Sequence, residues 1–163
     1  MKLKIKRYIY FTCVIICMCA VFTFSSQNSA KSGELSGGVT HAIASVLVHD
    51  FDKLSLSEQT EIVVSMHFYI RKAAHFTIFM TLGFFSFLTA STYKGSDKIK
   101  IPVVLLFCLL YASSDEIHQL FIPGRSGQFR DVCIDFCGSL TGTLAALLLT
   151  ELIRRIIKKK SKR

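Results

Sequence analysis

The sequence predicts an all-α integral membrane protein, a bundle of four transmembrane helices with both chain termini in the cytoplasm. Three observations predict this fold: 51% of the residues are hydrophobic, they gather in long apolar runs, and basic residues crowd beside those runs. Crossing the hydrocarbon core takes about 20 consecutive, mostly apolar residues. The length of 163 residues allows one compact domain, so we treat residues 1–163 as a single membrane domain.

Four apolar runs are long enough to cross a bilayer. We predict spans at residues 8–24, 73–93, 101–122 and 132–153. The basic head and short apolar core of the first run also describe a signal peptide, with cleavage after residues 28–30. Because this core is long for a signal peptide and the cleavage motif is poor, we predict that the first span is retained as an anchor.

The segment at 25–72 is polar, and we expect it on the extracytoplasmic side. Three glycines interrupt it, and it contains two weakly amphipathic stretches at 39–48 and 54–70. Both stretches are too polar to span, so we expect them to form short helices that lie on the membrane surface.

The distribution of Lys and Arg predicts the orientation. The head before the first span, the loop at 94–100 and the tail at 154–163 hold 14 of the 20 basic residues. The other six lie on the opposite face and are spread over much more sequence. Since cytoplasmic flanks carry the excess of positive charge, both termini are predicted to be cytoplasmic.

Ionisable residues lie within the spans at a similar outer depth, although an ionised group deep in a bilayer costs about 2.5–3.5 kcal/mol. In the third span Tyr111, Asp115, His118 and Gln119 share one helical face. Glu116 points about 100° away from that face, so we expect it to have a different partner.

The second and fourth spans repeat this arrangement. Arg71 and His75 lie one turn apart, and the fourth span carries carboxylates at the same spacing. Gly138 and Gly142 continue that face inward as a GxxxG pattern, which lets another helix approach closely. The carboxylates of the fourth span are Asp131 and Asp135.

Two interpretations of these charges compete. In the first, four basic residues neutralise four acidic ones and hold the bundle together. In the second, they line a pocket open to the outer leaflet, with His75 or His118 as a proton carrier. We favour the second, because two histidines exceed what charge balance requires. The basic residues are Arg71, Lys72, Arg125 and Arg130, and the acidic ones are Asp115, Glu116, Asp131 and Asp135.

Other site classes have weaker support. His75, His118, Asp115 and Asp135 offer ligands for a metal, but no HExxH or comparably specific spacing occurs, so we predict neither a metal nor another cofactor. The six cysteines all lie in apolar runs without a CxxC pair, which is typical of packing residues. We expect no nucleic-acid partner, because the basic residues lie beside apolar runs and form no stripe on a soluble segment.

The residues that carry these features resemble the VanZ-like family of bacterial membrane proteins. The most specific string runs from Tyr111 to Arg125 and contains Asp-Glu, His-Gln and Pro-Gly-Arg. The resemblance covers most of the chain, and the other matching pieces are Ser25-Ser26-Gln27, Arg71-Lys72-Ala73-Ala74-His75-Phe76, Leu82-Gly83, Asp131-Val132, Asp135, Gly138 and Gly142. The polar segment at 27–67 is longer than the family leads us to expect between the first two spans.

The resemblance implies a multi-pass protein of the bacterial cell membrane that acts at the outer face and is linked to teicoplanin-type glycopeptide susceptibility. It implies no settled reaction. Our leading hypothesis is that the protein binds or modifies an anionic or lipid-linked envelope component. In an enzyme, Asp115 would orient His118 as the proton carrier, with His75 as a further candidate. The predicted binding residues are Arg71, Lys72, Glu116, Gln119, Arg125, Asp131 and Asp135.

The alternative is a non-catalytic scaffold or partner-binding protein whose buried charges specify helix packing. A transporter or channel has less support, because residues 103–110 of the third span are unbroken apolar sequence. The sequence leaves open whether the protein is an enzyme and what its oligomeric state is.

Overall fold

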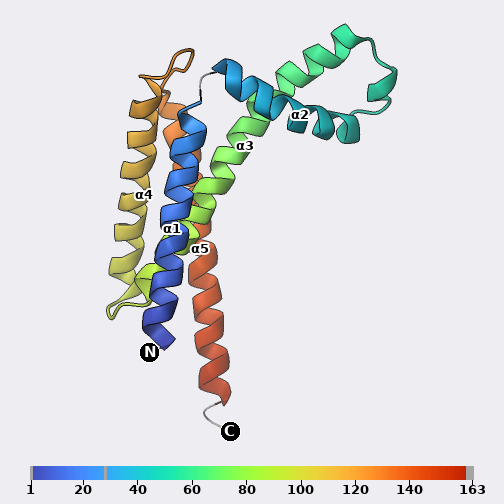
Figure 1. The fold of residues 1–163 in the computed structure, drawn as a ribbon. Coiled ribbons are helices and arrows are strands. Elements are labelled where there is room, and N and C mark those ends of the chain that lie inside the picture. The colour runs from blue at the N-terminus through green and yellow to red at the C-terminus, as the bar shows by residue number, and fades with distance from the viewer. Residues whose placement is uncertain (1, 28, 161–163) are drawn as a thin grey trace.

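Four helices of the computed structural model are long and apolar enough to cross a membrane, which confirms the predicted all-α fold (Figure 1). The structure describes the backbone of residues 2–27 and 29–160 and the side chains of residues 3–27 and 38–160. Within these ranges no strand occurs. The helices are α1 (Lys2–Ser25), α2 (Ser29–Leu47), α3 (Leu56–Ser91), α4 (Asp97–Gln119) and α5 (Phe129–Lys160), with the short 3-10 helix η1 (Phe51–Lys53).

The four candidate spans are α1, α3, α4 and α5. Both ends of the chain lie at the same end of the bundle, as an even number of crossings requires (Figure 1). Asn28 and the side chains of residues 29–30, where a signal peptidase would cut, lie outside the described residues. The same holds for the side chains of Lys2 and Lys31 and for residues 161–163, which entered the charge count.

The helix α3 is much longer than the predicted span at 73–93, which we expected to be separate from the amphipathic stretch before it. The span expected at 73–93 corresponds to its second half, which ends at Ser91, and the stretch at 54–70 belongs to the same continuous helix from Leu56 onward. Ser55 begins it with a capping box: its hydroxyl accepts the N–H of Glu58, and the Glu58 carboxylate accepts the N–H of Ser55. No glycine or proline lies between Leu56 and Ile70, so nothing local ends the helix at the membrane surface.

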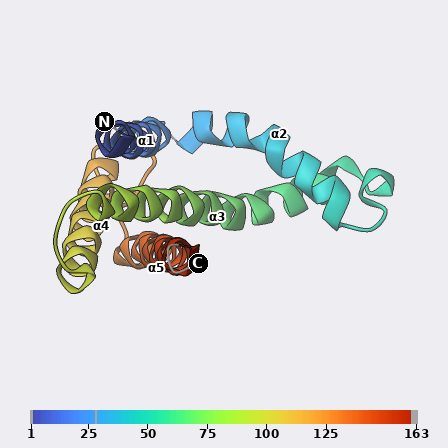
Figure 2. The same ribbon diagram turned by 90° about the horizontal axis from the view of Figure 1, so that it is seen from below.

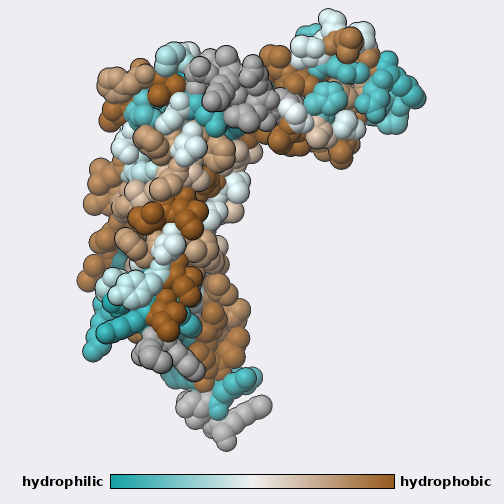
Figure 3. Space-filling model, viewed as in Figure 1, coloured by the Kyte–Doolittle hydropathy of each residue, from teal (hydrophilic) through white to brown (hydrophobic). Residues whose placement is uncertain are grey.

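The helices α2 and η1 and the first half of α3 form an arm that projects from the bundle at the end opposite the termini (Figure 1). Seen from below, α1 and α2 lie on one side of α3 and α5 lies on the other (Figure 2). On the face that Figure 3 shows, hydrophobic residues cover most of the bundle, whereas hydrophilic ones gather at the tip of the arm and toward the termini. This pattern fits a bundle that is surrounded by lipid.

The pair of α3 and α5 packs most extensively, and small residues allow it. A Cβ placed on Gly138 would collide with the carbonyl oxygen of Phe76, and one on Gly142 with that of Met80. The GxxxG prediction is therefore confirmed: the two glycines lie directly against the backbone of α3. Close backbone approach of this kind is how helices associate in lipid, where no hydrophobic driving force acts between them.

Hydroxyl groups add hydrogen bonds across the same interface. Ser139 Oγ donates to the carbonyl oxygen of Phe79 at 3.3 Å, and Thr143 Oγ donates to that of Gly83 at 3.4 Å. The core around this interface includes side chains from four helices: Val14, Cys17 and Val21 of α1, Phe79, Leu82 and Phe87 of α3, Val104, Cys108 and Ala112 of α4, and Ala146 of α5. The helix α1 is thus an integral part of the bundle.

Candidate functional site

Four carboxylates are buried near the arm end of the bundle. Asp115 and Glu116 belong to α4, Asp131 and Asp135 belong to α5, and none is more than 8% exposed. Burial of this many acidic groups within candidate spans needs compensation by hydrogen bonds, cations or protons.

Gln119 lies at the centre of a hydrogen-bond network that joins α3 to α4. Its side-chain amide Nε2 donates to Asp115 Oδ2 at 2.9 Å and to Glu116 Oε1 at 3.0 Å, and its Oε1 accepts from Arg71 at 3.2 Å. The side chain is 1% exposed. Glu116 also accepts the backbone N–H of Gln128 at 2.8 Å, so it has the separate partner that its helical position leads us to expect.

Asp115 and His118 have different partners in the structure. Ser25 Oγ of α1 donates to Asp115 Oδ2 at 2.8 Å. His118 Nε2 instead lies 3.1 Å from Ser26 Oγ, and its ring stacks on Phe22 with centroids 4.8 Å apart. The expected pair, in which Asp115 orients His118, is therefore not the arrangement found, because Asp115 accepts from Ser25 and His118 lies against Ser26.

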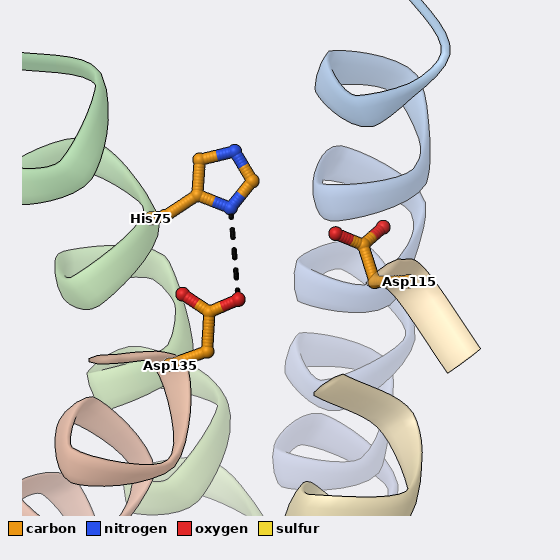
Figure 4. A group of neighbouring side chains, drawn as sticks. All are labelled: His75, Asp115 and Asp135. Carbon is orange, nitrogen blue, oxygen red and sulfur yellow. Dashed lines mark ion pairs between the residues drawn. The ribbon is translucent and has the colours of Figure 1, made fainter. Parts of the chain in front are cut away.

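His75, Asp135 and Asp115 meet from three different helices (Figure 4). His75 Nδ1 on α3 lies 3.8 Å from Asp135 Oδ2 on α5, and one ligand atom from each of the three residues lies within 4.8 Å of the others. Asp135 is 1% exposed, and its Oδ2 is enclosed without a hydrogen-bond partner among the described residues.

The first of the two interpretations, in which four bases neutralise four acids, is realised in one pair among the described residues. Lys72 forms an ion pair with Asp131. Among the residues that the structure describes, no other Lys or Arg nitrogen lies within 4.0 Å of the four buried carboxylates. Arg130 instead lies over the ring of Phe68 at 5.4 Å. A simple charge-balance network thus does not account for the cluster.

The two remaining arginines bind neutral oxygens. Arg71 donates to the Gln119 amide, and Arg125 donates to the carbonyl oxygens of Gln27 at 2.8 Å and Phe24 at 2.9 Å. Arg125 lies in the turn between α4 and α5. Burial, and then the neighbouring charge of Arg71, lower the pKa of Arg125 below its usual value. An anion between the two guanidinium groups would relieve that repulsion.

These arginines line a cavity of about 450 Å³ at the arm end of the bundle. Its walls come from α1, α2 and α3 and from the turn after α4. Apolar side chains form most of the lining, and Gln27, Arg71, His75 and Arg125 are its polar members. The lining residues are Val21, Phe24, Gln27, Val39, Ile70, Arg71, Ala74, His75, Ile78 and Arg125.

Sequence reasoning missed Ser25 and Gln27 as members of the site. Both follow the first span, in a string that the family resemblance singled out. Their roles depend on contacts to residues about 90–100 positions away, which helical periodicity does not report. Of the predicted residues, Arg71, His75 and Arg125 line the cavity, and Asp115, Glu116, Gln119 and Asp135 lie in the cluster behind it.

Fold and site together define a multi-pass helical membrane protein with a buried charged cluster near one end of its bundle. Residues 10–150 match the VanZ/LLP1 family, and the chain belongs to that family. The matched range contains every residue of the cluster and of the cavity. No curated protein and no solved structure matches the chain.

Proposed function

We propose that this protein binds an anionic, lipid-linked component of the bacterial cell envelope and sequesters or modifies it. This action would change the susceptibility of the cell to teicoplanin-type glycopeptides. One observation carries the proposal. The cavity of about 450 Å³ has apolar walls and two guanidinium groups, those of Arg71 and Arg125, that pair with no carboxylate within 4.0 Å among the described residues.

The donors suit a phosphate or carboxylate group. Guanidinium groups bind such anions through paired, charge-assisted hydrogen bonds. The apolar wall, which includes Val21 and Ile78, suits the hydrocarbon part of an amphiphile, and the volume lies within the range of about 300–1,000 Å³ typical of ligand sites. A lipid-linked phosphate has both parts in one molecule.

The proposed location follows from the charge count. The lining residues come from the last turns of α1, from α2 and from the middle of α3. These segments lie at the end of the bundle opposite the two termini (Figure 1). Because the basic flanks predict cytoplasmic termini, the cavity would face the outer leaflet, where peptidoglycan precursors and glycopeptides meet.

A packing role is the second candidate function. It is favoured by the hydrogen bonds that run from Ser25 through Asp115 and Gln119 to Arg71, because they join α1, α4 and α3. In that case the buried polar groups would specify the arrangement of the helices, and no ligand would be needed.

The test uses the full-length protein in a strain that lacks the chromosomal gene. Cells with wild type, Arg71→Gln/Arg125→Gln or Arg130→Gln are compared on teicoplanin, vancomycin and a lipoglycopeptide. Native mass spectrometry then reports the anionic lipids that remain bound to each purified protein. Arg130→Gln is the control for the loss of a guanidinium group, since it removes one such charge, where the double variant removes two, from an exposed position outside the cavity.

We expect the double variant to lose both the susceptibility phenotype and the bound anionic lipid, while its helix content and thermal stability stay close to wild type. Parallel loss of folded protein and phenotype would favour the packing role. An unchanged drug panel after deletion of the gene would refute the link to glycopeptides. Loss of the phenotype in a well-folded His118→Gln variant that still retains lipid would favour modification over simple binding.

A further inference from the structure

We infer that His75, Asp115 and Asp135 form a binding site for one divalent transition-metal cation of the Zn²⁺ or Mn²⁺ type. The sequence lacks a specific metal-ligand spacing, and we predicted no metal from it. The fold nevertheless brings an imidazole and two carboxylates together from α3, α4 and α5 (Figure 4). The site does not depend on the proposed lipid ligand.

The distances between the donor atoms are close to those around a bound cation. Bonds of about 2.0–2.2 Å place neighbouring ligands roughly 3–4 Å apart. One donor atom from each residue lies within 4.8 Å of the other two, and His75 Nδ1 lies 3.8 Å from Asp135 Oδ2. The most widely separated pair would have to approach by roughly 1 Å to reach the spacing around a bound cation.

A second observation, the surroundings of Asp135 Oδ2, also favours a cation at this position. Asp135 Oδ2 is enclosed, faces His75 and Asp115, and accepts no hydrogen bond from the described residues. An enclosed carboxylate oxygen without a donor is costly in an apolar surrounding. A protonated His75 would balance one of the two carboxylates, whereas a divalent cation balances both.

The surroundings hold the ligands in place. Ser25 Oγ and Gln119 Nε2 both donate to Oδ2 of Asp115, which orients this carboxylate and leaves Oδ1 outside those two bonds. Hydrogen-bonded outer partners of this kind are typical of metal ligands. A cavity of about 10 Å³, which is the lower limit for one water molecule, is lined by His75 and Asp135 and also by Arg71 and Lys72; a water there would be the fourth ligand.

The ligand set narrows the choice of ion. A nitrogen donor disfavours Ca²⁺ and Mg²⁺, which prefer oxygen ligands alone, and the absence of a thiolate from the three residues disfavours Cu⁺. Mixed imidazole and carboxylate donors suit Zn²⁺ and Mn²⁺. His75 also lines the larger cavity, so the cation would lie next to the region where Arg71 projects.

The test measures metal binding directly. Full-length protein is purified in detergent with a histidine-free tag, stripped with a chelator, and titrated with Zn²⁺ by calorimetry, with elemental analysis for stoichiometry. The variants are His75→Gln and Asp135→Asn. The controls, His49→Gln and Asp52→Asn, remove the same kinds of side chain from exposed positions on the arm.

We expect one Zn²⁺ per chain in the wild type and in both controls, and a rise in melting temperature on metal addition. Loss of a residue that only hydrogen-bonds to a metal ligand lowers metal affinity roughly 10–100-fold. His75→Gln and Asp135→Asn each remove a ligand itself, so their affinity for Zn²⁺ should fall by more than that. Pulsed EPR with Mn²⁺ should show a nitrogen coupling that disappears in His75→Gln, which decides the question even when Asp135→Asn folds poorly. A wild type without stoichiometric binding, or variants that bind as the controls do, would overturn the inference.

Discussion

Gly142→Ala should destabilise the protein, although alanine is the better helix former. The added Cβ would collide with the carbonyl oxygen of Met80 and would lie 2.7 Å from its carbonyl carbon and 2.9 Å from the backbone nitrogen of Phe84. These neighbours are backbone atoms of a packed helix, which no side-chain rotation can move aside. The pair of α3 and α5 must therefore separate.

The magnitude follows from three contributions. Overpacking of a close interface costs about 1–3 kcal/mol. Separation also weakens the hydrogen bonds of Ser139 to Phe79 and of Thr143 to Gly83, each worth about 0.6 kcal/mol in a membrane bundle. The gain in helix propensity offsets about 1 kcal/mol. The free energy of unfolding should fall by about 1–3 kcal/mol on balance.

The matched control is Gly38→Ala in α2, where an added Cβ meets nothing within 4 Å. Both variants are unfolded reversibly with SDS and followed by far-UV circular dichroism. The thiol of Cys108, fully buried in the core, reports the loosening of the bundle by faster labelling. Equal unfolding free energies for Gly142→Ala and Gly38→Ala would refute the argument that close backbone contact holds this interface together.

Two further predictions concern the first turn of α5, which contains Asp131, and the start of α3. Asp131→Asn leaves the largely buried Lys72 without its partner, so the free energy of unfolding should fall by about 3 kcal/mol in the same SDS titration. A Lys72→Met/Asp131→Asn double variant should recover part of this loss. A double variant that is no more stable than Asp131→Asn would contradict this reasoning. Ser55→Ala removes the capping box with Glu58 and should cost about 1 kcal/mol locally. Hydrogen exchange should then quicken in the first turn of α3 and not in the bundle, and an unchanged first turn would exclude a stabilising role for the cap.

Much of the fold and some of the site could be predicted from local sequence. Hydrophobic runs of sufficient length give the four spans, since an apolar helix in water and a polar helix in lipid are both costly. Helical periodicity shows that Gly138 and Gly142 share a face with Asp135, and the structure confirms that this glycine pair contacts another helix. Periodicity failed for residues 54–70, because a weakly amphipathic stretch does not reveal that it continues into the next apolar run.

The sequence by itself determined which segments are apolar enough to cross a membrane and which charged residues lie in or beside them. Only the tertiary structure decided how those charges are used: Asp131 pairs with Lys72, Asp115 binds Ser25, and Arg125 reaches the carbonyl oxygens after α1. Each choice depends on the rotation and crossing of helices that are about 60–100 residues apart in the chain. Composition and periodicity describe one helix at a time, so they predict a charged layer without the pairing, the cavity or the meeting of His75 with two carboxylates.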